Sequence, residues 1–477
     1  MKSLITTTGP AAAAPTTHSP SVRWALAALS LSMLLSSLGT SIANVALPTL
    51  AQAFDASFQQ VQWVVIVYLL AITTLVVGAG RLGDLIGRRR LLLAGVFVFT
   101  LASVLCGAAP TLGWLIAARA AQGLGAATLM AVTMALVGDT VPKAQTGSAL
   151  GLLGTMSALG TALGPSLGGV LIAGLGWRAI FLVNLPLGLL SFFLGHRYLP
   201  ADRPRPETSR AGFDPVGTLL LALTLAAYAL AMTLGHGRFG ALNVALLSAA
   251  VVGVGLFVLT EARVASPLIR LAMFRDAGFS TSLATSALVS TVMMATLVVG
   301  PYYLAHALGL DAATVGLVLS AGPLAAALTG VPAGRLVDRF GAQRLTVTGL
   351  LGMAAGAFAL ALLPAALGIP GYVGPMLVVT VGYALFQTAN NSAVMAEVGA
   401  AQRGVVSGML GLSRNLGLIS GASVMGAVFA LASATTDIGT AQPEAVAKGM
   451  QATSCVAAGL VVVALALALG ASRLLKR

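Results

Sequence analysis

Residues 147–169 read GSALGLLGTMSALGTALGPSLGG, and this stretch decides the fold. It holds no charged residue and is long enough to cross a bilayer as a helix. It also carries six glycines from position 151 onward and a proline at 165. In water so many helix breakers would indicate a loop. In lipid, glycine lets helix backbones approach closely, and neighbouring helices accommodate a proline. The stretch therefore predicts a thin, bent transmembrane helix that packs against a partner.

The whole chain has the composition of a polytopic membrane protein. Of its 477 residues, 58% are hydrophobic and 8% are charged, with a mean hydropathy of +0.96. A soluble globular protein needs more charge on its surface. The apolar runs are about 20 residues long rather than alternating ten-residue strands, so they predict helices and not a barrel. We therefore expect an all-α polytopic membrane protein.

Fourteen runs are apolar and long enough to span a membrane. They cover residues 24–49, 60–80, 92–109, 113–136, 148–172, 179–196, 214–234, 242–260, 279–303, 312–334, 346–365, 372–395, 404–432 and 451–472. Because the number of spans is even, both termini are expected on the same side of the membrane.

Basic residues dominate the charge balance, with 26 Lys and Arg against 13 Asp and Glu and a net charge of +13. If the amino terminus is cytoplasmic, the outer turns hold only Arg178, Arg238 and Lys448, while Arg119 and Arg414 lie within spans. The remaining basic residues face the cytoplasm, as the positive-inside rule requires. We therefore expect both termini in the cytoplasm of a bacterial inner membrane, and no nucleic-acid partner.

The chain contains an internal repeat. GRLGDLIGRRR at residues 80–90 returns as GRLVDRFGAQR at residues 334–344, and the glycines of residues 147–169 return at residues 404–426. The two offsets nearly agree, so spans 1–6 and 9–14 are parallel copies and spans 7 and 8 are an insertion. Two such bundles around an axis along the membrane normal form a transporter architecture, with the substrate site between them.

The repeat divides the chain into five parts. They are a cytoplasmic disordered tail at 1–23, an N-terminal six-helix bundle at 24–197, a cytoplasmic linker at 198–213, the inserted helices at 214–261 and a C-terminal six-helix bundle at 262–477. The two cysteines, Cys106 and Cys455, lie inside apolar runs with no metal or disulfide spacing. We expect no metal and no cofactor.

These motifs resemble those of the major facilitator superfamily, specifically the fourteen-helix drug–proton antiporter family. The resemblance covers nearly all of residues 24–472. It rests on the signature loop at 80–90, the helix 4 motif at 115–125, and further motifs at 44–48, 177–186 and 213–217. The antiporter motif of helix 5 is present at Gly151, Gly160, Gly164, Pro165, Gly168 and Gly169.

The resemblance implies the major facilitator fold, with two six-helix bundles plus two inserted helices. It also implies an exporter of amphipathic small molecules, driven by proton antiport through rocker-switch alternating access. The expected partners are a small-molecule substrate, protons and the lipid bilayer. The oligomeric state stays open, and a monomer suffices for this architecture.

The signature loop and its copy are the candidate gate. Asp84 can accept from nearby arginines or face a helix amino terminus of the other half, which would hold the cytoplasmic side shut. The alternative is that the loop arginines only orient the protein. Leu85 departs from the family, which often has Arg there, while the second copy keeps Arg339. The candidate gating residues are Gly80, Asp84, Gly87, Arg88, Arg90, Asp338, Arg339 and Gly341.

Two arginines lie within spans, where an unpartnered charge is expensive. Arg119 in helix 4 is expected to face a cavity or a partner and to serve coupling or cavity electrostatics, and the alternative is a tether to backbone carbonyls. Arg414 in helix 13 occupies the repeat position of Ser157. It either recognises a polar or anionic substrate or tethers neighbouring helices. Because the copy lacks a proline, we expect the Gly164–Pro165 bend to face helix 13.

Amide and aromatic side chains are candidates for the substrate cavity because amides donate and accept hydrogen bonds. The alternative for each is packing or a hydrogen bond between helices. The candidates are Asn44, Trp63, Tyr68, Gln122, Gln387, Asn390, Asn391 and Asn415.

The main departure from the family is the absence of a deep carboxylate. Helix 1 has residues 38–41 (LGTS) where the fourteen-helix branch often has an acid. Asp139, Asp214, Glu261 and Glu397 all lie at cytoplasmic span ends. The proton carrier is therefore a membrane-edge carboxylate, the substrate itself, or absent, and the case for strongly cationic substrates weakens.

Two other functions remain open. A specific metabolite or organic-anion transporter would keep the fold. A polytopic membrane enzyme would need a catalytic cluster at membrane depth. The four histidines, His18, His196, His236 and His306, are scattered over the tail and the span ends, so we expect no enzyme.

Asp84→Asn tests the gate. The closed gate loses a charge-assisted contact, so we expect transport to fall about tenfold with membrane insertion unchanged. Transport in whole cells and the amount of protein in the membrane are the measurements. Full efflux by the variant would exclude a gating role for Asp84.

Overall fold

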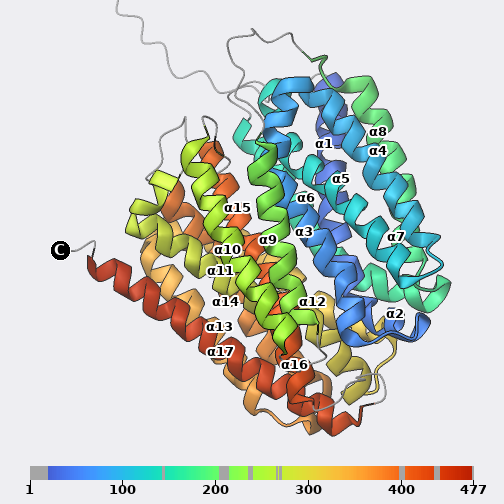
Figure 1. Ribbon diagram of the computed structural model, residues 1–477, viewed down its shortest axis with the longest axis vertical. Helices are drawn as coiled ribbons and strands as arrows, with labels where there is room; N and C mark the ends of the chain where they lie inside the picture. The colour runs from blue at the N-terminus through green and yellow to red at the C-terminus, as the bar shows by residue number, and fades with distance from the viewer. Residues whose placement is uncertain are drawn as a thin grey trace, which may run out of the picture.

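The computed structural model describes residues 20–141, 146–202, 214–234, 240–264, 267, 271–396, 403–433 and 441–474. Within these ranges the chain is helical and contains no strand. Fourteen helices in these ranges are long and apolar enough to cross a membrane, each close to a predicted span. The predicted all-α polytopic fold is therefore confirmed (Figure 1).

Three groups of helices follow one another along the chain. The N-half, residues 20–202, contains α1 (Pro20–Val45), α2 (Leu47–Ala53), α3 (Phe58–Ile86), α4 (Arg88–Gly107), α5 (Leu112–Thr140), α6 (Thr146–Leu175), α7 (Ala179–Leu182) and α8 (Asn184–Tyr198). The insert, residues 214–264, contains α9 (Pro215–Thr233) and α10 (Ala241–Arg263).

The C-half, residues 271–474, completes the fold. It contains the 3₁₀-helix η3 (Leu271–Arg275), α11 (Ala277–Tyr302), the π-helix η4 (Tyr303–Ala307), α12 (Ala312–Phe340), α13 (Ala342–Leu362), the 3₁₀-helix η5 (Ala365–Leu367), α14 (Gly368–Ala396), α15 (Arg403–Ser420), the π-helix η6 (Gly421–Met425), α16 (Gly426–Ala432) and α17 (Pro443–Leu474). The predicted tail and linker lie largely outside the described residues.

The repeat in the sequence is also a repeat in the backbone. Gly87 separates α3 from α4 with φ +104°, and Gly341 separates α12 from α13 with φ +85°. Both angles lie in the left-handed region, where a side chain is strained and glycine is not. Each loop therefore turns at its glycine. We call the end of the molecule with these two loops the basic end. The opposite end, where α1 and α11 finish and α3 and α12 begin, is the closed end.

Helix α6 runs through Pro165 without interruption and packs closely against α1. A Cβ added to Gly160 would lie 2.7 Å from the Leu34 carbonyl oxygen, and one added to Gly164 would overlap the Ser41 side chain. The Ser41 hydroxyl donates to the Gly160 carbonyl at 3.1 Å. The predicted close packing of this glycine-rich helix is confirmed, and α1 is one of its partners.

The other partner of α6 is α12, which corrects one prediction. A Cβ on Gly169 would lie 2.6 Å from the Ala312 carbonyl and 3.0 Å from Gly316 Cα. Helix α15, which carries Arg414, packs instead against α11 and α3. The expectation that the Gly164–Pro165 bend faces helix 13 was therefore wrong. The internal repeat explains this pairing. Because α15 is the copy of α6 and α12 is the copy of α3, the contact of α6 with α12 corresponds to the contact of α15 with α3.

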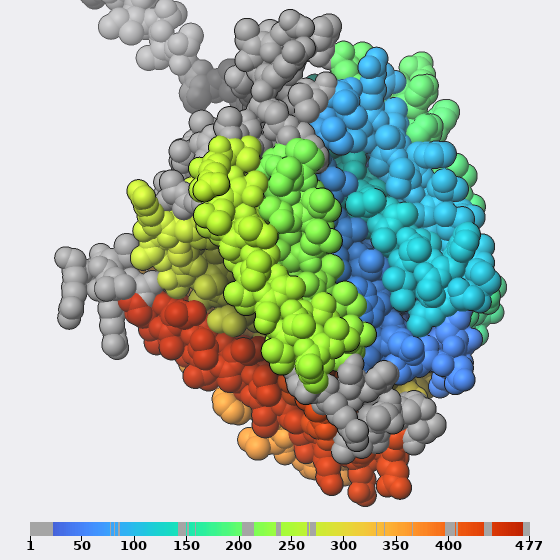
Figure 2. All heavy atoms as spheres, in the orientation of Figure 1, coloured from blue at the N-terminus to red at the C-terminus, as the bar shows by residue number. Residues whose placement is uncertain are grey.

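The insert lies between the two halves on one face of the molecule. Figure 1 shows α9 and α10, in green, between the blue N-half and the yellow-to-red C-half, and Figure 2 shows them covering that face. The Trp63 indole of the N-half donates to the Thr233 hydroxyl at 3.0 Å. The hydroxyl of Tyr228 in α9 shares a hydrogen bond of 3.1 Å with the hydroxyl of Ser420 in the C-half. Helix α9 is therefore bonded to both halves.

Gly164→Leu tests the packing of α6. The added side chain would meet Ser41 and the α1 backbone, so overpacking should lower stability by about 1–3 kcal/mol and reduce transport. Thermal unfolding of the purified protein is the measurement. Gly154→Leu is the matched control, because a Cβ on Gly154 of the same helix meets nothing within 4 Å. Equal behaviour of the two variants would contradict the close contact.

Candidate functional site

Three aromatic rings join the two halves at the closed end. Phe58 at the start of α3 packs against Tyr302 with ring centroids 4.6 Å apart and nearly perpendicular planes. It also packs against Phe429 of α16 at 5.4 Å. All three are buried, with at most 2% of each residue exposed. We call Phe58, Tyr302 and Phe429 the aromatic cluster. It packs the N-half against the C-half at this end.

Hydrogen bonds and glycine contacts join the halves at the same end. The Tyr302 hydroxyl donates to the Leu47 carbonyl at 3.2 Å. The Gln62 amide donates to the Ala422 carbonyl at 3.1 Å. Gln62 also fills the space beside Gly426, so α3 and α16 approach closely. The two halves therefore meet along two seams. In one, α3 packs against η6 and α16, and in the other, α6 packs against α12.

Sequence reasoning missed the aromatic cluster. Phe58, Tyr302 and Phe429 all lie near span ends, where aromatic residues commonly anchor a helix at the membrane interface. Nothing in the spacing separates an aromatic residue that faces lipid from one that faces the other half. Only the tertiary pairing of the repeats distinguishes them.

At the basic end, the described contacts of the signature loop join parts of the N-half. Arg88 donates to the Asp139 carboxylate at 2.8 Å and to the Ala135 carbonyl at 3.2 Å, linking α4 to α5. The Asp202 carboxylate accepts from the backbone N–H of Arg89 at 2.8 Å and of Arg90 at 3.2 Å. This places a negative charge at the amino terminus of α4, where the helix dipole favours it.

The gating residues themselves are placed by the backbone. Gly80 and Asp84 lie in the last turns of α3, and Asp338 lies at the equivalent place in α12. The side chains of Asp84 and Asp338 lie outside the described part of the structure. Arg339 is exposed and stacks over the Phe340 ring at 5.2 Å. The gating role therefore stays a prediction.

Arg119 is fully buried in the N-half and tethered to its surroundings. Its Nε donates to the Val64 carbonyl at 2.9 Å, and Nη1 donates to the Gly39 carbonyl at 3.1 Å and to the Gln122 amide oxygen at 2.6 Å. The guanidinium stacks on the Tyr68 ring at 4.0 Å. These contacts join α5 to α1 and α3. The geometry is that of the tether named above as the alternative to a coupling role.

Several cavity candidates belong to this tether or to the interior of one half. Gln122 donates to the Ser103 hydroxyl at 2.6 Å, and Tyr68 donates to the Ser36 carbonyl at 2.9 Å. The Asn44 amide donates within α1 to the Thr40 carbonyl at 3.2 Å. In the C-half, Asn390 and Asn415 are buried too. The structure leaves Trp63, Gln387, Asn391 and Arg414 partly exposed.

Arg414 differs from Arg119. It is partly exposed, its Nε is buried, and that atom has no hydrogen-bond partner among the described residues. Tyr383 of α14 interacts with it electrostatically. Gln387, one turn farther along α14, donates to Asn391 at 3.4 Å and has a buried carbonyl oxygen without a partner. Gln387 and Asn391 thus follow, at four-residue spacing along α14, the tyrosine with which Arg414 interacts.

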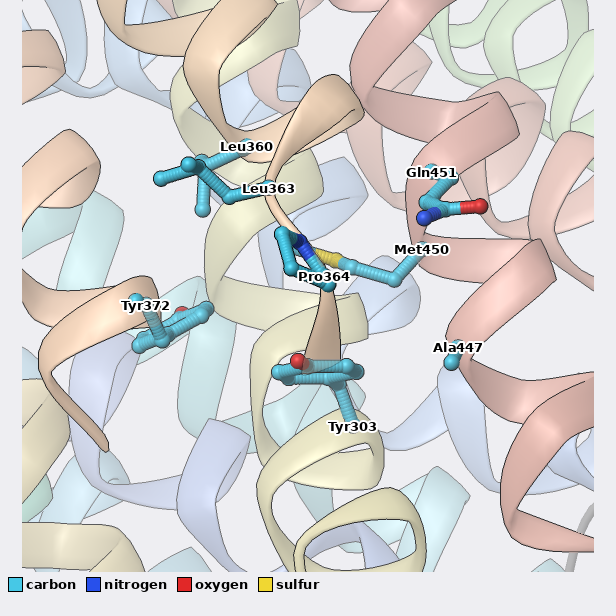
Figure 3. Close-up of a pocket in the computed structure, with 9 residues that line it drawn as sticks. Tyr303, Leu360, Leu363, Pro364, Tyr372, Ala447, Met450 and Gln451 are labelled. Carbon is cyan, nitrogen blue, oxygen red and sulfur yellow. The ribbon is translucent and has the colours of Figure 1, made fainter. Parts of the chain in front are cut away.

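A small cavity lies elsewhere, at the closed end of the C-half. Figure 3 shows it between Tyr303 of η4, Tyr372 of α14 and Met450 of α17. The space open to a water-sized sphere is about 10 Å³, the volume needed for one water. It is too small for an organic substrate. Among the described residues no group of three or more His, Cys, Asp or Glu can hold a metal ion.

Known proteins share this fold and much of this sequence. The family profile of the Major Facilitator Superfamily matches residues 29–422. The multidrug resistance protein Stp of Mycobacterium tuberculosis is 34% identical over 416 residues, covering 85% of this chain and 75% of that protein. The riboflavin transporter RibZ of Clostridioides difficile is 31% identical over 396 residues, covering 83% and 86%.

A solved structure agrees in fold. A bacterial homologue of the human lysosomal transporter Spinster, in an inward-facing and unoccupied conformation, is 16% identical with a TM-score of 0.71, covering 96% of this chain and 98% of that one. The matched profile covers most of the chain. This multi-pass membrane protein therefore belongs to the major facilitator superfamily of transporters.

Proposed function

We propose that this protein exports amphipathic small molecules across a bacterial inner membrane by alternating access of its two halves. One observation carries the proposal: among the described residues, two repeat-related halves meet at the closed end through the aromatic cluster and the flanking helix contacts. A transporter that rocks about a central site needs such a separable contact at each end, used alternately. The multidrug resistance protein among its relatives supports export of drug-like compounds.

The proposed orientation of the protein in the membrane follows from the distribution of its basic residues. Arg88, Arg89 and Arg90 begin α4 at the basic end, and Arg339 and Arg344 lie at the equivalent place in the C-half. The positive-inside rule then assigns the basic end and both termini to the cytoplasm. In this orientation the closed end faces outward, so the aromatic cluster and the flanking contacts lie at the outer side of the membrane.

The contacts that must separate are weak enough for a transport cycle. An aromatic pair contributes about 0.5–1.5 kcal/mol beyond its buried area, and a hydrogen bond about 0.5–1.5 kcal/mol. Two ring pairs and two hydrogen bonds at the closed end therefore contribute a few kcal/mol in total. A ligand that binds one state more tightly by that amount can shift the equilibrium.

Proton antiport is the energy source we propose, with carboxylates at the membrane edge as its candidate carriers. Asp139 is paired with Arg88, whereas Asp214 and Glu261 are buried at the basic end of the insert. Both carboxylates lie beside Gly217, where an added Cβ would meet oxygens of each. Two neighbouring acids at the membrane edge are therefore the groups we propose to test as proton carriers.

A specific metabolite or organic-anion transporter is the second candidate. Two observations favour it. Arg414 of the C-half donates to no oxygen among the described residues, and the predicted spans contain no deep carboxylate. One protein of similar sequence is named a riboflavin transporter, which supports a specific metabolite as the substrate. This candidate keeps the fold, the gate and the alternating access.

Export and proton coupling are tested together. In an efflux-deficient bacterial host, the protein should lower the accumulation of at least one class in a panel of cationic, neutral and anionic aromatic compounds. In inverted membrane vesicles with an imposed pH gradient, adding that compound should collapse the gradient. Accumulation unchanged across the panel would contradict export. Transport without proton movement would rule out antiport.

Phe58→Ala tests the closed end. The substitution removes both ring contacts of Phe58 and leaves space behind, which weakens closure by about 2–5 kcal/mol. Spin labels on the exposed Gln52 and Glu444, in the N-half and the C-half, should move apart in the variant. Phe97→Ala is the control, because Phe97 is 58% exposed on the surface of α4. An unchanged distance distribution in Phe58→Ala would exclude the cluster as a gate.

A further inference from the structure

The two arginines within the spans have opposite surroundings. Arg119 has no exposed surface, donates to three oxygens and stacks on Tyr68. Arg414 is partly exposed and donates to no oxygen among the described residues. Arg119 therefore holds three hydrogen bonds inside the N-half, although its buried Nη2 has no partner among the described residues, whereas Arg414 holds none there.

Helix α15 presents Arg414 away from its own packing contact. The neighbouring Ser413 is buried and its hydroxyl donates to the Leu283 carbonyl of α11 at 2.5 Å, which fixes the rotation of α15. Arg414 is one residue on and lies near Tyr383 of α14. Tyr383, Gln387 and Asn391 recur at four-residue spacing and are all partly exposed. They form one polar stripe along α14, and Arg414 interacts electrostatically with its first member, Tyr383.

The repeat shows that this charge is particular to the C-half. The equivalent residue of α6 is Ser157, whose hydroxyl shares a hydrogen bond of 2.7 Å with Ser37 of α1. A small residue therefore serves the helix contact at this position. In the C-half an arginine replaces it, and its neighbour Ser413 supplies the helix contact instead. Among the described residues the guanidinium donates to no oxygen, so it can bind another partner.

The positive charge of Arg414 indicates which kind of ligand it would bind. A guanidinium stays protonated in a protein, and a charge at membrane depth without a counter-charge is costly. Among the described residues, the buried acids are Asp214 and Glu261, which lie in the insert. A ligand that brings its own negative charge relieves this cost, and carboxylates match the planar fork of arginine in bidentate geometry.

We propose that Arg414, Tyr383 and Gln387 form a subsite for the carboxylate of an amphipathic organic anion. The guanidinium binds the oxyanion, the Tyr383 hydroxyl supplies a further donor, and the unpartnered Gln387 oxygen accepts from a polar group beside the carboxylate. The inference rests on the proposed transport function and names its substrate class. It places recognition of the substrate charge in the C-half, while the buried arginine of the N-half holds its bundle together.

Three probes with one aromatic body test the subsite: naphthoate, naphthalenemethanol and naphthylmethylamine, which are anionic, neutral and cationic. Binding is measured on the purified full chain in lipid nanodiscs. We expect naphthoate to bind about tenfold more tightly than naphthalenemethanol, as a charge-assisted bidentate contact provides. Arg414→Gln should abolish that preference and leave naphthalenemethanol binding unchanged. Arg414→Lys should keep a reduced preference, because it retains the charge and loses the fork.

The control is Arg197→Gln, which removes an exposed arginine at the end of α8 and should leave all three affinities unchanged. A naphthoate preference that survives in Arg414→Gln, or no preference in the unaltered protein, overturns the subsite. If Arg414→Gln does not fold, Arg414→Lys decides: a preference equal to that of the unaltered protein overturns the bidentate contact.

Export of the same probes separates this inference from the proposed function. Binding that depends on Arg414 without export of any probe would leave the subsite standing and overturn the transport proposal. Export of naphthalenemethanol together with a charge preference that ignores Arg414 would leave the transport proposal standing and overturn the subsite.

Discussion

The membrane interior holds no water, so every charge and every polar backbone group at that depth must find its partner inside the protein. Most of the structure follows from this constraint. Arg119 meets it with carbonyl and amide oxygens from three helices and so joins α1, α3 and α5. The hydroxyls of Thr73 and Thr100 meet it by donating to carbonyls of their own helices. Arg414 meets it incompletely, and that is why it stands out as a place for a ligand.

The same constraint makes backbone proximity the main source of specificity between helices. Lipid tails are as apolar as leucine, so burial alone gives no reason for one helix to prefer another. Small residues supply the reason, because they let backbones and hydroxyls meet. Gly164 brings α6 onto Ser41 of α1, and Gly169 brings it onto Gly316 of α12. The glycine stretch is therefore a surface with two faces, one for its own half and one for the other.

Much of this was readable from sequence, for physical reasons that also set the limit. Fourteen apolar runs and the repeat of residues 80–90 at 334–344 predicted the fold, because span length and repeated turn glycines depend on local chemistry. The partner of α6 was predicted wrongly, since which repeats cross between halves is a property of the assembled pair. The aromatic cluster was missed because an aromatic residue at a span end has the same local signature whether it faces lipid or protein. The two arginines looked alike in sequence, and only their hydrogen-bond partners distinguish them.

One feature of the insert has a mechanical consequence. Helix α9 is bonded to Trp63 on one side and, through Tyr228, to Ser420 on the other. Trp63 is adjacent to Gln62, and Ser420 is two residues from Ala422, the pair that closes this seam. When the seam opens, Trp63 and Ser420 separate, so a rigid α9 cannot keep both bonds. If the halves separate here as proposed, α9 keeps its bond to one half and gives up or shifts its bond to the other.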